Sequence, residues 1–197
     1  GILVKKTCAL LHTLKKMISS YHTLNKDPKI NRKEVISLIT DNDIFWYKNI
    51  TIDTNSKVFE LFPNTLIRLL YSSVKKDVAE EQPNFKVIQY TIALLNAMAS
   101  MKKGRDYLLP KDSNQPHGDH MTQLLIKRLV QILSKETEDT LLRQYTIGVL
   151  QKFSLRNIAQ LCMIELDVIS KIVNLIRTEY QTIGEYSLEW AMAMLMN

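Results

Sequence analysis

One short segment occurs three times in this chain. Residues 89–95 read Gln-Tyr-Thr-Ile-Ala-Leu-Leu, residues 144–150 read Gln-Tyr-Thr-Ile-Gly-Val-Leu, and residues 185–191 read Glu-Tyr-Ser-Leu-Glu-Trp-Ala. The tyrosines of successive copies are 55 and 41 residues apart. A helical repeat of about 40 residues is typical of a solenoid. Solenoids usually present a surface that holds other molecules.

Each copy is preceded by a second apolar segment, at residues 66–70, 124–130 and 168–176. Apolar residues recur there at steps of three and four, as the buried face of a helix requires. Shorter helices are predicted at residues 103–109 and 155–164. Three helices per unit predict an all-α fold, a right-handed armadillo-type α-solenoid.

The repeats predict five segments along the chain. A loop insert rich in Pro, Gly, Asp, Asn and Ser explains the longer of the two spacings. The predicted segments are an irregular helical part at 1–62, a repeat at 63–109, the insert at 110–119, a repeat at 120–154 and a truncated repeat at 155–197.

Two helices are predicted in the irregular part. Asn31 is expected to cap the second, which begins at Arg32. A cluster of aromatic residues at 44–47 is expected to anchor this first, irregular repeat. The expected apolar side of the first helix, residues 2–21, is Leu3, Leu10, Leu14, Met17 and Ile18. That of the second is Val35, Ile36, Leu38 and Ile39.

Three features of the sequence indicate the cellular compartment in which the protein is expected. No run of about 18 uncharged apolar residues occurs, so no membrane span and no membrane partner are predicted. The chain starts with apolar and then basic residues, the reverse of a signal peptide. Cys8 and Cys162 are far apart in helical patterns, which disfavours a structural disulfide. A cytoplasmic, reducing compartment is expected.

The net charge of +6 is concentrated near the start of the chain. Residues 1–41 hold eight of the 26 Lys and Arg but only three of the 20 Asp and Glu. The repeats carry no basic stripe of the kind that nucleic-acid binding requires, so a solvated surface is the favoured interpretation. A salt-sensitive binder of acidic polymers, such as tubulin tails or nucleic acid, is kept as an alternative.

No catalytic pattern is found. The chain has no Gly-rich phosphate loop, no Ser/His/Asp or Cys/His arrangement and no zinc spacing. His117 and His120 lie in a segment predicted as a loop, without further ligands, so a surface loop is favoured over a metal site. The prediction is a non-enzymatic chain with no cofactor and no metal.

Residues 89–99 resemble the third helix of an armadillo repeat. In peptide-binding members of that superfamily an Asn holds the backbone of an extended peptide and a Trp forms slots for its side chains. Asn96 takes the Asn place, but Gln151 and Met192 stand there in the other copies. Ile92 and its counterparts take the Trp place. The chain therefore lacks that ladder, which argues against recognition of the nuclear-import type.

A narrower resemblance covers residues 83–197. Residues 95–109, 143–156 and 186–197 are similar to the armadillo region of the LisH-domain armadillo-repeat family of ciliary basal bodies, which is linked to Joubert-type ciliopathy. The family's LisH segment is not in this chain. The resemblance implies a non-enzymatic scaffold at the basal body, centriole and cilium, supporting ciliogenesis. It implies ciliary or microtubule-associated protein partners that control axoneme length and stability.

Two sets of candidate binding residues follow from these patterns. Polar residues of the third helices are expected to line a concave protein-binding face, or else to be ordinary solvent-facing positions; they are Gln89, Asn96, Gln144, Gln151, Glu185 and Glu189. A basic edge for an acidic partner is the second candidate, although basic residues also favour helix C-termini; its members are Lys102, Lys103, Arg105, Lys152 and Arg156.

The repeated tyrosines allow an aromatic binding ladder, but packing between repeats is the favoured interpretation. Solenoids need polar terminal repeats as caps, but the last predicted helix stops at the apolar run 193–196 without one. The sequence is therefore expected to be an excised piece of a longer protein. A self-associating module, joined through exposed solenoid ends, is therefore a further hypothesis beside the scaffold. Direct contact with microtubules is left open.

Overall fold

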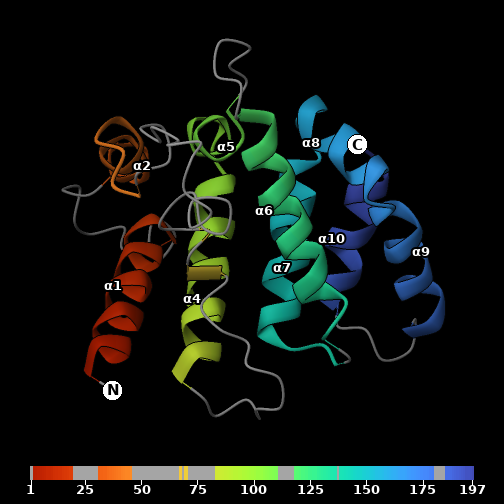
Figure 1. Ribbon diagram of the computed structural model, residues 1–197, viewed down its shortest axis with the longest axis horizontal. Helices are drawn as coiled ribbons and strands as arrows, with labels where there is room; N and C mark the ends of the chain where they lie inside the picture. Colours follow the sequence, from red (N-terminus) through yellow and green to blue (C-terminus); the bar gives the residue numbers. More distant parts are fainter. Residues whose placement is uncertain are drawn as a thin grey trace, which may run out of the picture. The chain divides into compact units, whose positions relative to one another are not determined.

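The regular structure of the chain is helical throughout its described part. The computed structural model describes residues 2–19, 31–45, 67, 69–70, 83–110, 118–136, 138–179 and 185–197. Every regular element in these ranges is a helix, which confirms the all-α prediction (Figure 1). The chain divides into two compact units, residues 1–107 and 108–197, and each is described by itself.

Unit 1 is built around the contact between its first and fourth helices. Within it, α1 packs against both α4 and α2. The short α5 ends one residue beyond the unit. The bounds are α1 (Ile2–Ser19), α2 (Arg32–Asp41), α4 (Pro83–Ala99) and α5 (Lys102–Leu108).

The buried face of α1 differs in part from the expected one. Ile18 was expected on that face and is fully buried, together with Leu11, whereas Leu3 and Leu10, which were also expected there, are 78% and 60% exposed. Both pairs are seven residues apart, so each forms a stripe along one face of a helix. The sequence offered two adjacent stripes, and packing against α4 selects the one that contains Leu11.

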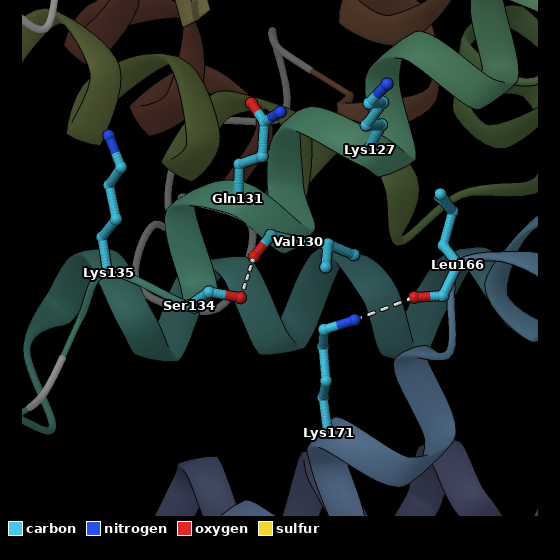
Figure 2. Close-up of a pocket in the computed structure, with 7 residues that line it drawn as sticks. All are labelled: Lys127, Val130, Gln131, Ser134, Lys135, Leu166 and Lys171. Carbon is cyan, nitrogen blue, oxygen red and sulfur yellow. Dashed lines mark hydrogen bonds between the residues drawn. The ribbon is translucent and has the colours of Figure 1, made fainter.

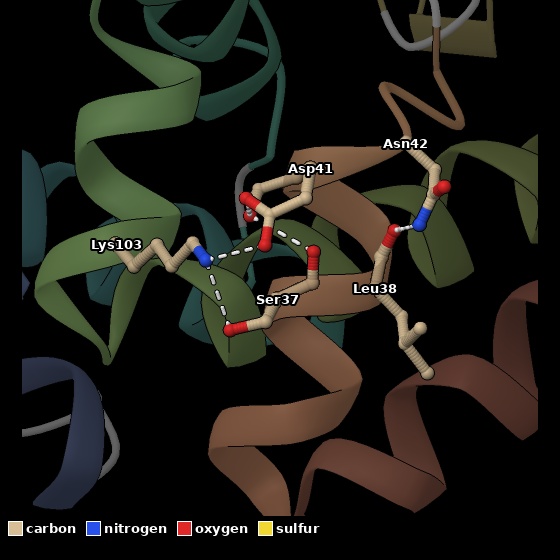
Figure 3. Close-up of polar contacts among 6 residues, drawn as sticks. Ser37, Leu38, Asp41, Asn42 and Lys103 are labelled. Atoms are coloured by element: carbon tan, nitrogen blue, oxygen red, sulfur yellow. Dashed lines mark hydrogen bonds and ion pairs between the residues drawn. The ribbon is translucent and has the colours of Figure 1, made fainter.

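The start of α2 is confirmed. The Asn31 side chain accepts a hydrogen bond of 3.0 Å from the Lys33 amide, as a helix cap should. Leu38 was expected on the apolar face but is 60% exposed. Its carbonyl instead accepts a hydrogen bond of 2.8 Å from the Asn42 side chain, which closes the helix (Figure 3).

Polar contacts tie α5 to the end of α2. Lys103 Nζ lies 2.7 Å from Asp41 Oδ2 and donates to Ser37 Oγ at 3.0 Å (Figure 3). The Tyr107 hydroxyl donates to Asp43 Oδ1 at 2.6 Å, and both side chains are buried. An exposed ion pair contributes about 0–1 kcal/mol. The buried bond to a carboxylate contributes more, about 1.5–3 kcal/mol.

Gly104 allows α5 to cross close to the end of α4. A Cβ atom at this position would lie 2.1 Å from the Met98 carbonyl oxygen and 2.7 Å from its carbon. Both are backbone atoms, so a side-chain rotation cannot relieve the contact. Only glycine therefore fits this turn between the two helices.

The described part of unit 2 contains two pairs of consecutive helices, α6 with α7 and α9 with α10, and the short α8 between them. In this unit α7 packs against α6 and α10, α6 packs against α8, and α9 contacts α8 and α10. The bounds are α6 (Gly118–Leu133), α7 (Leu141–Phe153), α8 (Asn157–Glu165), α9 (Val168–Glu179) and α10 (Glu185–Leu195).

Hydrogen bonds define the ends of several of these helices. The Thr140 hydroxyl caps α7 by accepting from the Arg143 amide at 3.1 Å. Gln160 Nε2 donates to the Ser154 carbonyl at 2.7 Å, and Asn197 Nδ2 donates to Ser154 Oγ at 2.8 Å. These contacts fix the turn between α7 and α8 against the end of α10.

Most of the predicted helices are present with shifted ends. The insert was expected to extend to residue 119, but α6 already begins at Gly118. Phe45 of the expected aromatic cluster is buried, while Ile44 is 49% exposed. Trp46, Tyr47 and the expectations for residues 49–66 lie outside the described residues. Within the described part, no helix combines the length and hydrophobicity that a membrane span needs.

The close approach at Gly104 leads to a first prediction. Gly104→Ala should lower the free energy of unfolding by at least about 2 kcal/mol, because a buried backbone contact must shift to accept the methyl group. Chemical denaturation followed by circular dichroism measures the change. Lys102→Ala, an exposed position on the same helix, is the matched control and should stay within about 0.5 kcal/mol. Equal stability of the two variants would contradict the geometry.

Candidate functional site

The candidate site consists of the polar residues on two otherwise buried helices. Along α4, Gln89 and Asn96 are half-buried on a helix whose described side chains are mostly buried. Along α7, Gln144 and Gln151 are half-buried in the same way. Each pair is separated by seven residues, about two helical turns, and therefore lies on one face of its helix. The expected spacing is thus present within each helix.

Gln144 is already engaged within the fold. Its Nε2 donates to Asp139 Oδ2 at 3.0 Å. The other carboxylate oxygen of Asp139 accepts a short hydrogen bond from the hydroxyl of Ser187, on α10. Asp139 therefore links the start of α7 to α10. A partner bound at this point would have to use the remaining groups of the Gln144 amide.

A cation–π contact joins α7 and α10 next to Gln151. Lys152 Nζ lies 4.9 Å from the centroid of the Trp190 ring and donates to the Gly148 carbonyl at 3.1 Å. Such contacts contribute about 0.5–1 kcal/mol when they are exposed. The sequence analysis missed this pair because the two residues are far apart in sequence. The Lys at the end of α7 and the aromatic residue in the third copy were its only signals.

The third copy of the segment differs from the first two on α10. Glu189 is exposed, whereas the equivalent residues Ala93 and Gly148 are buried. Its neighbour Trp190 makes the contact with Lys152. The side chain of Glu185 lies outside the described residues.

In unit 1 an aromatic contact connects α4 with α1. The rings of His12 and Tyr90 meet edge to face with centroids 5.5 Å apart. This contact places Tyr90 between the two helices, in line with the favoured interpretation. Burial raises the pKa of the nearby Cys8 thiol, and the charge of Lys86 opposes this shift. Tyr145 is half-buried, and the Tyr186 side chain lies outside the described residues.

Contacts within the fold occupy much of the proposed basic edge. Lys103 pairs with Asp41, Arg105 Nη1 donates to the Ala99 carbonyl at 2.7 Å, and Lys152 stacks on Trp190. Lys102 is exposed on α5 and Arg156 is half-buried at the N-cap of α8. Lys102, Lys103 and Arg105 lie in unit 1, whereas Lys152 and Arg156 lie in unit 2.

The repeated hydroxyl residue shows a bonding pattern that sequence reasoning did not anticipate. Thr91 Oγ1 donates to the Val87 carbonyl and Thr146 Oγ1 to the Leu142 carbonyl, each at 2.7 Å. Ser187 instead bonds Asp139, on another element. The hydroxyl thus stays inside its own helix in two copies and crosses to a neighbour in the third.

Residues 5–11 of α1 share Thr, Ala and two Leu with residues 89–95. Thr7 Oγ1 donates to the Leu3 carbonyl at 3.0 Å, the bond that Thr91 makes in α4. Leu10 is 60% exposed, however, whereas the equivalent Leu94 is fully buried. The partial match in sequence therefore does not extend to the same packing.

Comparison with known proteins identifies relatives of this chain. It is 34% identical over 111 residues, 56% of the chain, to the LisH domain-containing protein ARMC9 of Bos taurus. It is 35% identical over the same share to that of Homo sapiens, and 32% identical over 133 residues, 68% of the chain, to that of Pongo abelii. The resemblance to the LisH-domain armadillo-repeat family is confirmed.

The chain corresponds to a small part of these relatives. It spans 15%, 12% and 17% of the Bos taurus, Homo sapiens and Pongo abelii proteins. Their shared name designates a domain and no catalytic activity. No protein-family model matches the chain. No solved structure matches it either. Within the described residues, no group of three or more His, Cys, Asp or Glu could hold a metal ion.

The two kinds of hydroxyl bond should differ in their effect on stability. Ser187→Ala should lower the free energy of unfolding by about 1–3 kcal/mol, because the buried hydroxyl contact to Asp139 is lost and its carboxylate loses a donor. Thr146→Val is the matched control at the equivalent position. It should change stability by less than about 1 kcal/mol, since the Leu142 carbonyl keeps its backbone partner. Thermal and urea denaturation of both variants measure this difference, and a larger loss for Thr146→Val would contradict it.

Proposed function

We propose that this chain is the interaction segment of a non-enzymatic scaffold of the cilium and basal body. In this proposal it folds as a right-handed armadillo-type α-solenoid of three-helix repeats. It supports ciliogenesis and the length or stability of axonemal microtubules by binding protein partners. The observation that carries the proposal is the similarity to LisH domain-containing proteins over 56–68% of the chain.

The order of helices supports the three-helix repeat. A short helix is followed by two longer ones twice in succession. The helices α5, α6 and α7 have 7, 16 and 13 residues, and α8, α9 and α10 have 9, 12 and 11. The tyrosine segment falls in the last helix of each triplet, and α7 and α10, which both carry a copy, pack together in unit 2.

The burial pattern supports the third helices as the binding surface. A helix that is apolar on nearly every side must be enclosed, and the few polar positions that remain half-exposed face the partner. Asn96 and Gln151 occupy equivalent positions, one in each unit. Their amides can both donate and accept hydrogen bonds, which suits the backbone of a bound polypeptide.

Exchange of these two amides tests the proposal in cells. Asn96→Lys together with Gln151→Lys, in the full-length protein, should fail to restore basal-body localisation and cilium length in cells that lack it. The introduced charges disrupt hydrogen bonding to a partner, and thermal denaturation of the purified variants establishes that they remain folded. Immunofluorescence and cilium-length measurements give the result.

The matched control carries Gln123→Lys and Asn157→Lys, two exposed positions on α6 and α8. This variant has the same change in net charge and should restore both properties. Full rescue by the Asn96 and Gln151 variant, at normal expression, would contradict the assigned surface. Failure of both variants would show that added charge alone impairs the protein.

A salt-sensitive contact with acidic tubulin tails is the second candidate function. The observation that favours it is the composition of α1, which contains Lys5, Lys6, Lys15 and Lys16 but no Asp or Glu. In unit 1 this helix packs against α4, which contains Lys86 and no acidic residue. The paired helices therefore have an excess of positive charge.

Co-sedimentation with microtubules tests this second candidate. If α1 contacts the tubulin tails, the chain should pellet with intact microtubules at low salt and remain in solution after removal of the tails by protease. Binding should fall steeply as salt is raised from about 50 to 200 mM, because the contact would be electrostatic. No pelleting at either salt concentration would contradict direct contact with the microtubule lattice and would leave binding to other proteins of the cilium as the proposed function.

A further inference from the structure

Unit 2 contains an open groove that lies apart from the residues predicted as binding sites. It is formed by α6, the end of α8 and the start of α9, and its volume is about 560 Å³ (Figure 2). Its position follows from the packing of α8 against both α6 and α9. The residues that line it are Lys127, Val130, Gln131, Ser134, Lys135, Leu166 and Lys171.

The groove combines apolar side chains with a basic rim. Val130 is buried and Leu166 half-buried, and both contribute carbon surface. The side chains of Lys127, Lys135 and Lys171 are exposed. Figure 2 shows Lys171 reaching from α9 towards the carbonyl of Leu166, to which its Nζ donates at 3.0 Å. An ammonium group has three donors, so Lys171 can also bind a second acceptor.

No acidic residue is among those that line the groove. In the described part of the chain, no ion pair involves any of the three lysines. Glu136 accepts a hydrogen bond from the Thr140 hydroxyl, at the turn that leads to α7. Glu165 and Asp167 flank Leu166 and are exposed. The groove therefore presents three positive charges, with its acidic neighbours outside its lining.

The spacing of the lysines indicates an extended ligand. Lys127 and Lys135 are eight residues apart along and just past α6, which corresponds to about 12 Å at 1.5 Å per residue. Figure 2 shows the two side chains well apart, with neither pointing towards the other. An extended peptide advances about 3.3 Å per residue, so acidic side chains four residues apart would reach both lysines.

We propose that this groove binds an acidic, extended segment of a partner protein, with an aliphatic side chain of that segment against Val130 and Leu166. Carboxylates of the segment pair with Lys127, Lys135 and Lys171. A nucleic acid fits less well, because the lining offers neither an aromatic ring nor an arginine on which a base could stack. The site is independent of the third-helix surface, so either proposal can fail without the other.

Peptide binding to the 197-residue chain tests the inference. The probe is a fluorescein-labelled peptide with two leucines among glutamates, and fluorescence anisotropy gives its Kd. The double groove variant Lys127→Glu, Lys135→Glu should bind at least about tenfold more weakly, as expected for loss of close charge pairs. The matched control is Lys33→Glu, Arg177→Glu, two exposed positions outside the groove, which has the same net charge as the double groove variant and should change Kd by less than about threefold.

Two altered peptides test the chemistry without altering the protein. Replacing the glutamates by glutamine should abolish measurable binding, and replacing the leucines by serine should weaken binding about tenfold through loss of apolar burial. Thermal denaturation establishes that both protein variants remain folded. These peptide results stand even if the groove variant is destabilised.

Several results would overturn the proposal. One is no binding of the glutamate–leucine peptide to the unmodified chain at low salt. Another is an equal loss of affinity in the double groove variant and the control, which would indicate a general effect of charge. Tighter binding of single-stranded polyuridine, lost in the groove variant alone, would assign the groove to nucleic acid instead.

Discussion

The enclosure of the apolar helices α4 and α7 is the constraint on which the rest of the structure depends. Both helices have apolar or small residues on most of their sides, so a single neighbour cannot cover them. In each unit a neighbouring helix covers part of that surface, α1 in the first and α10 in the second. The remaining helices are short or amphipathic, since one side of each packs on the helices already described and the other side faces solvent. The polar positions of α4 and α7 stand out because they are rare.

The sequence was sufficient for the elements and their order but not for the choice of buried face. Periodicity predicted every helix of unit 2, and the Asn31 cap was read correctly. In α1, apolar residues recur every seven positions along two adjacent lines, one through Leu10 and one through Leu11. Only packing against α4 determines that Leu11 is the buried one. Gly104 is a similar case, because its role depends on a backbone oxygen six residues away in another helix.

For the candidate site, the sequence predicted residue types and spacing but not their engagement. Gln89, Asn96, Gln144 and Gln151 do lie on one face of their own helices. The contacts of Asp139 with Gln144 and Ser187, and of Lys152 with Trp190, required the packing of α7 on α10. The groove lysines follow no repeat, since they come from α6, the turn after it and α9, so no motif could have marked them.

The distribution of methionines in unit 2 gives it an unequal response to oxidants. Met121 and Met163 are almost completely buried, whereas Met192 and Met196 on and after α10 are 52% and 86% exposed. Oxidation of a thioether to the sulfoxide turns an apolar side chain into a polar one, and accessible sulfurs react first. Peroxide would therefore change the outer surface of α10 before it reaches the core. The extent of sulfoxide formation at these two sites is a chemical footprint of whatever covers that helix in the cell.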